Sequence, residues 1–256
     1  MKKIAVLSDL HSGHVVGLTH PDWQETKQNK FQRVQRACWQ FYADNIKQDG
    51  PFDIVFVNGD CIEGTGRATG GTELITVDRE KQCEMATAAL RLAIGRRTKS
   101  IFTYGTGYHT GDQEDWETLI AHDLNAEHIG SHEWVTVEGI TFDLKHHCGT
   151  SAVPYGRHTA VARDRLWNVL WSERSMQPKS DVVIRSHVHY YDFCGSCDFL
   201  AMTTPALQGY GAKYGARRCS GIVHFGFVVF QVEKGEYSWQ PRIALVDALR
   251  AKDIRL

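Results

Sequence analysis

Four short polar segments, each at the end of a hydrophobic run, constrain what this chain can fold into. A short hydrophobic run is typical of a buried strand, and one polar turn after such a strand is common. Four such clusters built around Asp and His are not explained by packing alone. In open α/β sheets, residues at the carboxyl ends of the strands gather at one edge, where ligands bind. The clusters are Asp9-Leu10-His11 after residues 4–7, Asn58-Gly59-Asp60 after residues 54–57, His109 after residues 101–104, and His187-Val188-His189 after residues 182–184.

The composition is that of a soluble globular protein, with 256 residues of which 42% are hydrophobic and 23% charged. The formal net charge of −1 predicts no general attraction to nucleic acid or to an anionic membrane, although it leaves room for a local basic groove. No hydrophobic run approaches the roughly 18 residues that span a bilayer, and the run after Lys3 stops at Asp9, too early for a signal peptide. We therefore expect a cytoplasmic protein with no membrane partner.

The cysteines indicate reduced thiols, because seven is an odd number and the chain has no dense cysteine framework. One pair, Cys194 and Cys197, has CxxC spacing. No second CxxC exists to complete a zinc ribbon, so we expect this pair to be structural or incidental.

Hydrophobic spacing predicts alternating strands and helices in the N-terminal half and antiparallel strands near the C-terminus. The order β-α-β-α-β implies a parallel core with helices on its faces. No repeat or low-complexity linker divides the chain, so we predict a single domain over residues 1–256. The expected elements are strands at 3–8, 53–57, 99–104 and 181–186, helices at 24–48, 78–97, 114–124 and 158–173, a hairpin at 135–142, and antiparallel strands within 221–243.

The spacing within the clusters suits metal binding. Alternate side chains of an extended segment point to the same side, so Asp9 and His11 can bind one ion together. His187 and His189 repeat this spacing, and Asp60 arrives from the neighbouring strand as a natural bridge. Two divalent ions held close together need several N and O donors and a carboxylate that contacts both. The residues therefore predict a two-metal site.

At these residues the chain resembles the calcineurin-like metallophosphoesterase superfamily, whose ordered motifs are D-x-H, G-D, G-N-H, a lone His and G-H-x-H. The resemblance spans residues 4 to about 190 and implies a βαβαβ core with mixed sheets sandwiched by helices, followed by antiparallel C-terminal strands. The matching residues here are Asp9-Leu10-His11, Gly59-Asp60, Gly107-Tyr108-His109, His146 and Ser186-His187-Val188-His189.

The resemblance also implies roles for these residues. One ion would be held by Asp9, His11, Asp60 and His189, and the other by Asp60, His146 and His187. His109 matches the histidine that acts as general acid or stabilises the phosphate. The mixed Asp and His donors without cysteine favour Mn²⁺, with Fe, Zn or Ni as alternatives.

The chain departs from the family pattern at two positions. Tyr108 stands where the family has an Asn that binds the second ion, so either Thr106 or water would supply the missing oxygen. Ser186 replaces the Gly before the last histidine pair, a milder change. For the lone His we favour His146 over the adjacent His147.

Other residues near the motifs have weaker claims to function. Among arginines that could bind phosphate, Arg67 and Arg157 are the favoured candidates. Trp167 and Trp171, four residues apart on one predicted helix, are expected in the core rather than as a surface for base stacking. The further candidates are Arg163 and Arg165 for phosphate binding, Glu63 and Asp112 for orienting ligands, and His158 as a histidine close to the lone-His motif.

The function predicted first is a metal-dependent phosphodiesterase or nuclease, in which a metal-bound hydroxide attacks phosphorus and His109 assists the leaving oxygen. Its substrate would be a phosphoester, with nucleic acid or a nucleotide as the candidate. A phosphomonoesterase acting on a phosphoprotein or a small metabolite is the alternative, since the same ions serve both reactions. The missing Asn raises a third hypothesis, a non-catalytic binding module. The sequence leaves the oligomeric state open.

Overall fold

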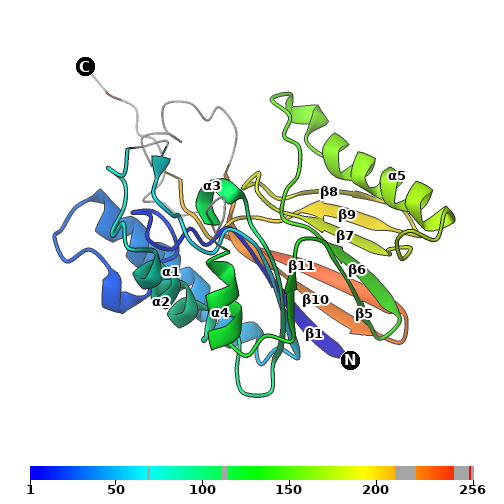
Figure 1. The fold of residues 1–256 in the computed structure, drawn as a ribbon, viewed down its shortest axis with the longest axis horizontal. Coiled ribbons are helices and arrows are strands. Elements are labelled where there is room, and N and C mark those ends of the chain that lie inside the picture. Colours follow the sequence, from blue (N-terminus) through cyan, green and yellow to red (C-terminus); the bar gives the residue numbers. More distant parts are fainter. Residues whose placement is uncertain (68–69, 111–114, 211–222, 245–253, 255–256) are drawn as a thin grey trace.

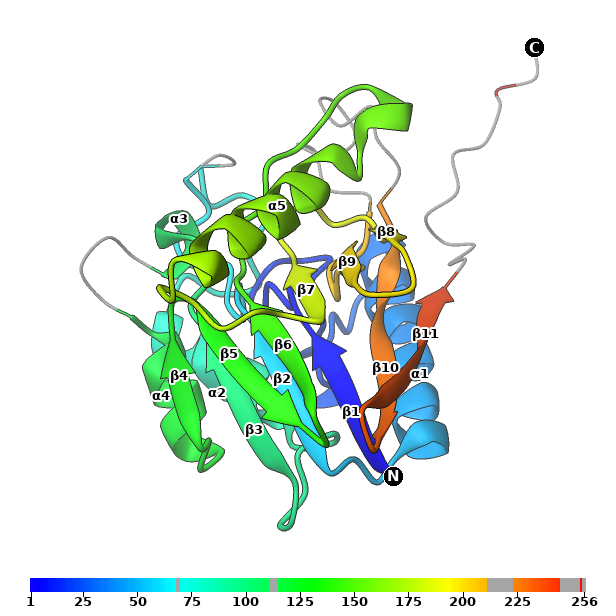
Figure 2. The ribbon, with the colours of Figure 1, turned by 90° about the vertical axis from the view of Figure 1, so that its right-hand side faces the viewer.

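Two β-sheets packed face to face form the centre of the computed structural model, which describes residues 1–67, 70–110, 115–210, 223–244 and 254. Helices lie on the outer face of each sheet (Figures 1 and 2). The described strands form one sheet in the order β11-β10-β1-β2-β3-β4 and another in the order β5-β6-β7-β9-β8. The predicted fold class, mixed sheets sandwiched by helices with antiparallel C-terminal strands, is confirmed.

The first sheet is parallel from β1 to β4 and antiparallel at the two strands closest to the C-terminus. Its central strand β1 is buried on both faces from Ile4 to Leu7, which explains the uninterrupted hydrophobic run in the sequence. The short β4 was not predicted. The strands are β1 (Lys2–Leu7), β2 (Ile54–Asn58), β3 (Lys99–Thr103), β4 (His128–Gly130), β10 (Phe225–Glu233) and β11 (Glu236–Ala244).

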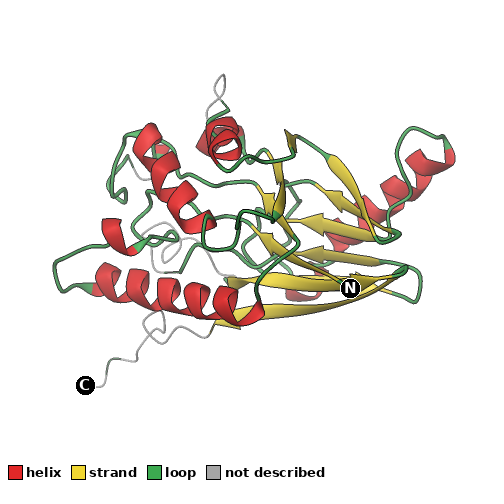
Figure 3. Cartoon of the chain, turned by 90° about the horizontal axis from the view of Figure 1, so that it is seen from below, coloured by secondary structure: helices red, strands yellow, loops and turns green. Residues whose placement is uncertain are grey.

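Three helices, α1 (Lys30–Asp49), α2 (Arg79–Leu90) and α4 (Glu117–Asp123), cover the outer face of the first sheet, and α1 is shown lengthwise in Figure 3. The predicted start of α1 at residue 24 is wrong, because the Asn29 side chain caps the helix by accepting from Gln32 N. Its predicted end before Gly50 is confirmed. The prediction that α2 continues to residue 97 is also wrong, since the helix ends at Leu90 and turns follow.

The second sheet begins with the predicted hairpin, β5 (Glu133–Val137) and β6 (Ile140–Leu144). Glu138 and Gly139 have φ of 50° and 89°, as the tight turn requires. The sheet continues with β7 (Val182–Arg185), β9 (Leu200–Thr203) and β8 (Asp192–Gly195). Its inner side chains, including Phe142, pack against those of the first sheet in one hydrophobic core.

Helix α5 (Thr159–Glu173) covers the outer face of the second sheet, where Val161 packs against Val183 and Ala201. A buried ion network fastens it, with Arg185 contacting Asp164 of α5 at 2.7 Å and Asp143 of β6 at 2.7 Å. The expectation that Trp167 and Trp171 lie in the core is wrong, because both are exposed. Apolar residues occupy two faces of this helix, and only the face of Val161 meets the sheet.

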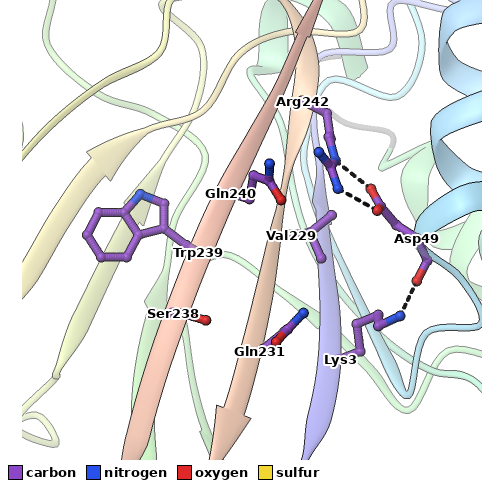
Figure 4. Close-up of a pocket in the computed structure, with 8 residues that line it drawn as sticks. All are labelled: Lys3, Asp49, Val229, Gln231, Ser238, Trp239, Gln240 and Arg242. Carbon is purple, nitrogen blue, oxygen red and sulfur yellow. Dashed lines mark hydrogen bonds and ion pairs between the residues drawn. The ribbon is translucent and has the colours of Figure 1, made fainter.

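Asp49, at the end of α1, fastens the helix to the edge of the first sheet. Its carboxylate accepts two hydrogen bonds from Arg242 of β11, at 2.6 and 2.7 Å, and its carbonyl accepts from Lys3 of β1 (Figure 4). These residues line a cavity of about 390 Å³ whose other walls are Val229, Gln231, Ser238, Trp239 and Gln240. Lys3 and Arg242 are already bonded to Asp49, so the cavity marks a structural contact between α1 and the first sheet.

The described cysteines all have free thiols, Cys194 and Cys197 among them. No described helix combines the length and the hydrophobicity that a membrane span requires.

The Arg185 network predicts a large loss of stability when the cation is removed. In Arg185→Met, the buried Asp143 carboxylate loses its charged partner, and breaking a buried pair in this way costs about 3–5 kcal/mol. We expect that decrease in the free energy of unfolding, measured by urea denaturation. Arg174→Met, at an exposed position, is the control and should change it by less than about 0.5 kcal/mol. Equal small changes in both variants would contradict the role of the network.

Candidate metal centre

The six predicted metal ligands all follow the carboxyl ends of strands, and they come from both sheets. Asp9 and His11 follow β1, and Asp60 follows β2, in the first sheet. His146 follows β6, and the pair His187 and His189 follows β7, in the second sheet. Because the two sheets pack face to face, these loops meet at a shared edge, and the structure brings all six residues together.

Backbone hydrogen bonds between the loops after β1 and β2 set the position of the first three side chains. Asp9 N donates to Gly59 O, and His11 N donates to Asp60 O, each at 3.0 Å. Ser12 N continues the series to Cys61 O at 3.0 Å. The parallel pairing of β1 and β2 is thus extended past the strand ends, so that Asp9, His11 and Asp60 lie side by side.

Five of the six predicted ligands have a left-handed backbone, which non-glycine residues seldom adopt. A residue held in such a region costs on the order of 1–3 kcal/mol and persists only where its surroundings fix it. Such strain clusters at functional sites, which supports a functional role for this edge. The φ values are 52° at Asp9, 47° at His11, 52° at Asp60, 72° at His187 and 56° at His189.

Two glycines are required by close packing around Asp60. A Cβ at Gly59, whose φ is +80°, would lie 2.5 Å from His146 Nδ1. A Cβ at Gly105, in the loop after β3, would lie 2.2 Å from Asp60 Oδ1. The site therefore leaves no room for a side chain at either position.

Three groups of three donors among the described residues could each hold a metal ion, with the ligand atoms of each group within 4.8 Å of one another. Asp9, His11 and His189 form one, Asp60, His146 and His187 form the second, and His11, Glu63 and His109 form the third. The first two match the ligand sets that the resemblance implies, although Asp60 belongs to one group only. Their role as ligands stays a prediction.

Unpaired buried atoms show that this arrangement fits metal ions. Asp9 Oδ1 and His146 Nε2 are buried and form no well-aligned hydrogen bond with the described residues, although each lies beside an oppositely charged group, Asp9 Oδ1 being 3.2 Å from His189 Nε2. His146 Nε2 lies 2.9 Å from Asp60 Oδ2 and 3.9 Å from Asp9 Oδ1, so His146 Nε2 and Asp9 Oδ1 face the same space. A cation between them would supply the missing interactions.

The electrostatics of the cluster also suit cations. Burial alone would lower the pKa of His146, but the Asp60 and Asp9 carboxylates raise it to about 10. Burial would likewise raise the pKa of Asp9, but His189 and His146 lower it to about 2. The same opposition holds the pKa of Asp60 well below its ordinary value. The carboxylates are therefore charged at neutral pH, as metal ligands must be.

His146, and not its neighbour His147, lies in the cluster, as favoured from the sequence. Its ring is buried, and Nδ1 donates to Asn58 O at 2.7 Å, which leaves Nε2 directed at the carboxylates. His147 is exposed, and its ring lies against that of His187. Such a bond from the second ring nitrogen to a carbonyl is the usual way in which a metal-binding imidazole is oriented.

Glu63 links His11 with His109. Its Oε2 lies 2.8 Å from His11 Nδ1, and its backbone O lies 3.1 Å from His109 Nδ1. His109 belongs to the short helix α3 (Gly107–Thr110), which was not predicted, and its Nε2 lies 3.9 Å from Asp60 Oδ2. The placement of Glu63 agrees with the orienting role expected for it, whereas Asp112 lies outside the described residues.

Thr106, one of the two replacements expected for the missing Asn, lies beside Asp60. Its backbone N donates to Asp60 Oδ1 at 2.7 Å, and its hydroxyl lies 3.1 Å from the same oxygen. Tyr108 is 41% exposed and lies edge-on to the His109 ring. The choice between Thr106 and water as the source of the missing oxygen stays a prediction.

Ser186, the other departure, belongs to a chain of buried hydroxyls below the site. Its Oγ accepts from Asn58 Nδ2 at 2.7 Å and lies 2.8 Å from Thr204 Oγ1, which in turn contacts Ser8 Oγ at 2.8 Å. The hydroxyl therefore joins loops of both sheets, which a glycine could not do.

Sequence reasoning missed Glu117. This buried residue of α4 accepts from Cys61 N at 2.8 Å and from Gly105 N at 2.6 Å, and so holds the loops on either side of Asp60. Burial, together with the negative charge of Asp60, raises the pKa of Glu117 to about 7. The signal in the sequence is an acidic residue on the same helix face as Ile120 and Ala121, which are buried.

The candidate phosphate-binding arginines differ in their surroundings. Arg157 lies over the ring of Tyr190 at 4.8 Å, next in sequence to His189, and Arg67 is exposed in the loop after Glu63. Arg165 is wrong as a candidate, because it is buried and donates to Asn168 Oδ1 and Ser180 O. The other two candidates, Arg163 and His158, are exposed at the N-terminal part of α5.

The crowding at Gly105 predicts a metal-binding defect from one added methyl group. In Gly105→Ala, the new Cβ displaces the Asp60 carboxylate, and we expect metal affinity to fall by about tenfold or more, measured by calorimetric titration of Mn²⁺. Gly95→Ala is the matched control, because its Cβ meets nothing closer than 3.7 Å. Unchanged affinity in Gly105→Ala would show that Asp60 is not a ligand or that its loop can shift.

No family model and no curated protein matches the chain. Solved structures that align with it include an archaeal phosphodiesterase, 17% identical, with 93% of this chain and 99% of that chain covered and a TM-score of 0.46. Vps29 from Entamoeba histolytica in complex with Zn²⁺ is 12% identical, with 94% and 98% covered and a TM-score of 0.45. A predicted phosphoesterase from Streptococcus pneumoniae is 10% identical, with 94% and 90% covered and a TM-score of 0.40.

At these identities and TM-scores the alignments carry no argument about the site. The residues of the chain itself are more informative, because each motif follows the end of a different strand and all of them meet at one edge. In the order of its motifs, and in their placement at the strand ends, the chain resembles the calcineurin-like metallophosphoesterases.

Proposed function

We propose that this chain is a metal-dependent phosphoester hydrolase, and specifically a phosphodiesterase, with two divalent ions at the edge shared by its sheets. The observation that supports this most strongly is the pair of adjacent donor groups, each built from one carboxylate and two imidazoles. In this proposal Asp9, His11 and His189 hold one ion, His146 and His187 hold the other, and Asp60 contacts both.

When bound, two such ions neutralise phosphate oxygens and lower the pKa of water from 15.7 toward about 7. The oxygen and nitrogen donors favour Mn²⁺, with Fe, Zn or Ni as alternatives. The chain contributes the fixed geometry. Thr106 and the tight approach of Gly105 hold the Asp60 carboxylate in one orientation. His146 would offer Nε2 to an ion, because its Nδ1 already donates to Asn58 O.

His109 is the proposed acid. With Nδ1 against Glu63 O, its Nε2 is left for a proton that can pass to the leaving oxygen. The ring is partly buried beside Asp60 and lies outside the two donor groups assigned to the ions, although it forms a third donor group with His11 and Glu63. In this proposal it acts on the substrate and holds no metal, which its substitution tests.

A diester of a nucleotide or nucleic acid is the favoured substrate because an exposed aromatic ring, that of Tyr108, lies beside His109. Tyr108 presents an exposed ring edge-on to His109, with ring centroids 4.8 Å apart. A base attached to the reacting phosphate can stack on such a ring, and base–aromatic stacking contributes about 1–3 kcal/mol. Arg157, on the Tyr190 ring beside His189, is the proposed phosphate contact, and Arg67 is a second.

The proposed roles predict different losses from two substitutions. His109→Ala should reduce turnover by about 10²- to 10⁴-fold and leave the metal content unchanged, because it removes the acid alone. Asp60→Asn should lose both ions, because it removes the bridge. Turnover of bis(p-nitrophenyl) phosphate and p-nitrophenyl phosphate in Mn²⁺, together with metal analysis, tests both.

His122→Ala, at an exposed site on α4, is the control and should behave as the unaltered protein. Preference for the monoester would make the protein a phosphatase, and absence of turnover with both ions bound would favour a non-catalytic module. Loss of metal in His109→Ala would overturn the role of that residue.

The position of Thr106 beside Asp60 predicts that the affinity for the second ion can be increased. Thr106→Asn introduces a carboxamide oxygen beside Asp60, and we expect affinity for the ion assigned to Asp60, His146 and His187 to rise by about tenfold, measured by Mn²⁺ titration. Thr106→Val, of similar size but without the hydroxyl, should weaken it. Identical titrations for both variants would show that no oxygen of this side chain reaches the ion.

A further inference from the structure

Helix α5 exposes a continuous apolar stripe on the face opposite to the second sheet. The exposed fractions are 58% for Leu166, 53% for Trp167, 47% for Leu170 and 39% for Trp171. These residues recur at the spacing of one helix face, and the helix lies at the outer side of the molecule (Figure 1). Single exposed apolar residues are ordinary, but a contiguous group of large ones marks an interaction surface.

The stripe is not needed for the packing of α5 within the chain. Val161, Arg165 and Asn168 are the buried residues of the helix and lie on its other face. Exposed apolar residues also stand at both ends, Tyr155 before the helix and Met176 after it. The apolar surface thus covers the C-terminal half of the helix, and exposed apolar side chains lie beyond both of its ends.

We propose that the α5 stripe binds the same stripe of a second copy of this chain, with the two helices antiparallel about a two-fold axis near Asn168. Leu166 and Leu170 lie two residues on either side of Asn168, so each Leu166 is level with Leu170 of the second copy. An isologous contact of this kind is the commonest way in which identical subunits pair.

The charges at the ends of the stripe favour this partner. Arg163 and Glu173 lie five residues on either side of Asn168, so the same register places Arg163 level with Glu173 of the second copy, twice. Both side chains are exposed, and neither forms an ion pair with the described part of the chain. Arg174 is level with Ala162, which avoids a clash of like charges.

The same charges argue against nucleic acid as the partner. A surface that binds the phosphate backbone presents several cations of one sign, whereas this stripe has Arg163 and Arg174 together with Glu173.

Sedimentation velocity over a concentration series tests the proposal with the complete chain. We expect a reversible dimer that Leu170→Glu weakens at least about tenfold, because it places a carboxylate in an apolar contact. Leu119→Glu is the matched control, since Leu119 is 49% exposed on α4 and should leave the dimer intact. Circular dichroism of each variant excludes misfolding as the cause.

Charge reversal tests the register. Arg163→Glu or Glu173→Arg alone should weaken the dimer, and the two together should restore it, a result that a general apolar contact would not produce. A monomer at all concentrations, or a dimer unaffected by Leu170→Glu, would overturn the proposal. Quenching of tryptophan fluorescence by single-stranded oligonucleotide in a monomeric protein, abolished in Trp167→Ala, would instead assign the stripe to nucleic acid.

Discussion

The backbone pairing between the loops after β1 and β2 is the constraint on which the site depends. It fixes Asp9, His11 and Asp60 in left-handed conformations, from which their side chains reach a common space. The second sheet adds its histidines from the facing loops, and buried hydroxyls at Ser8, Ser186 and Thr204 hold the two sets of loops together. Five of the six predicted ligands thus come from strained turns at the ends of strands, so their positions are set before any ion binds.

The sequence reveals most of the site because the donors stand at the ends of hydrophobic strands, a local pattern. His146 is favoured on the same basis, and the structure buries it. What the sequence does not reveal depends on packing between distant segments. In the sequence Glu117 resembles any acidic helix residue, and only the fold shows that it accepts hydrogen bonds from Cys61 N and Gly105 N. The start of α1 was missed because hydrophobic spacing does not show which polar residue caps the helix.

The error over Trp167 and Trp171 has a different origin. Periodicity identifies an apolar helix face but not whether the protein itself covers that face. Helix α5 has two such faces, and the second sheet can cover only one. A helix that is apolar on more than one side is therefore a sign of either deep burial or a second contact, and only the structure distinguishes the two.

The order of strands in the first sheet has a consequence for synthesis of the chain. β1 lies in the middle of the sheet, between β2 and β10, yet β10 begins at residue Phe225. Until that segment leaves the ribosome, this central strand has one open edge, and an unpaired edge of this kind invites aggregation. The nascent chain therefore has to protect β1 while almost the whole sequence is translated, which makes it a natural client for a chaperone.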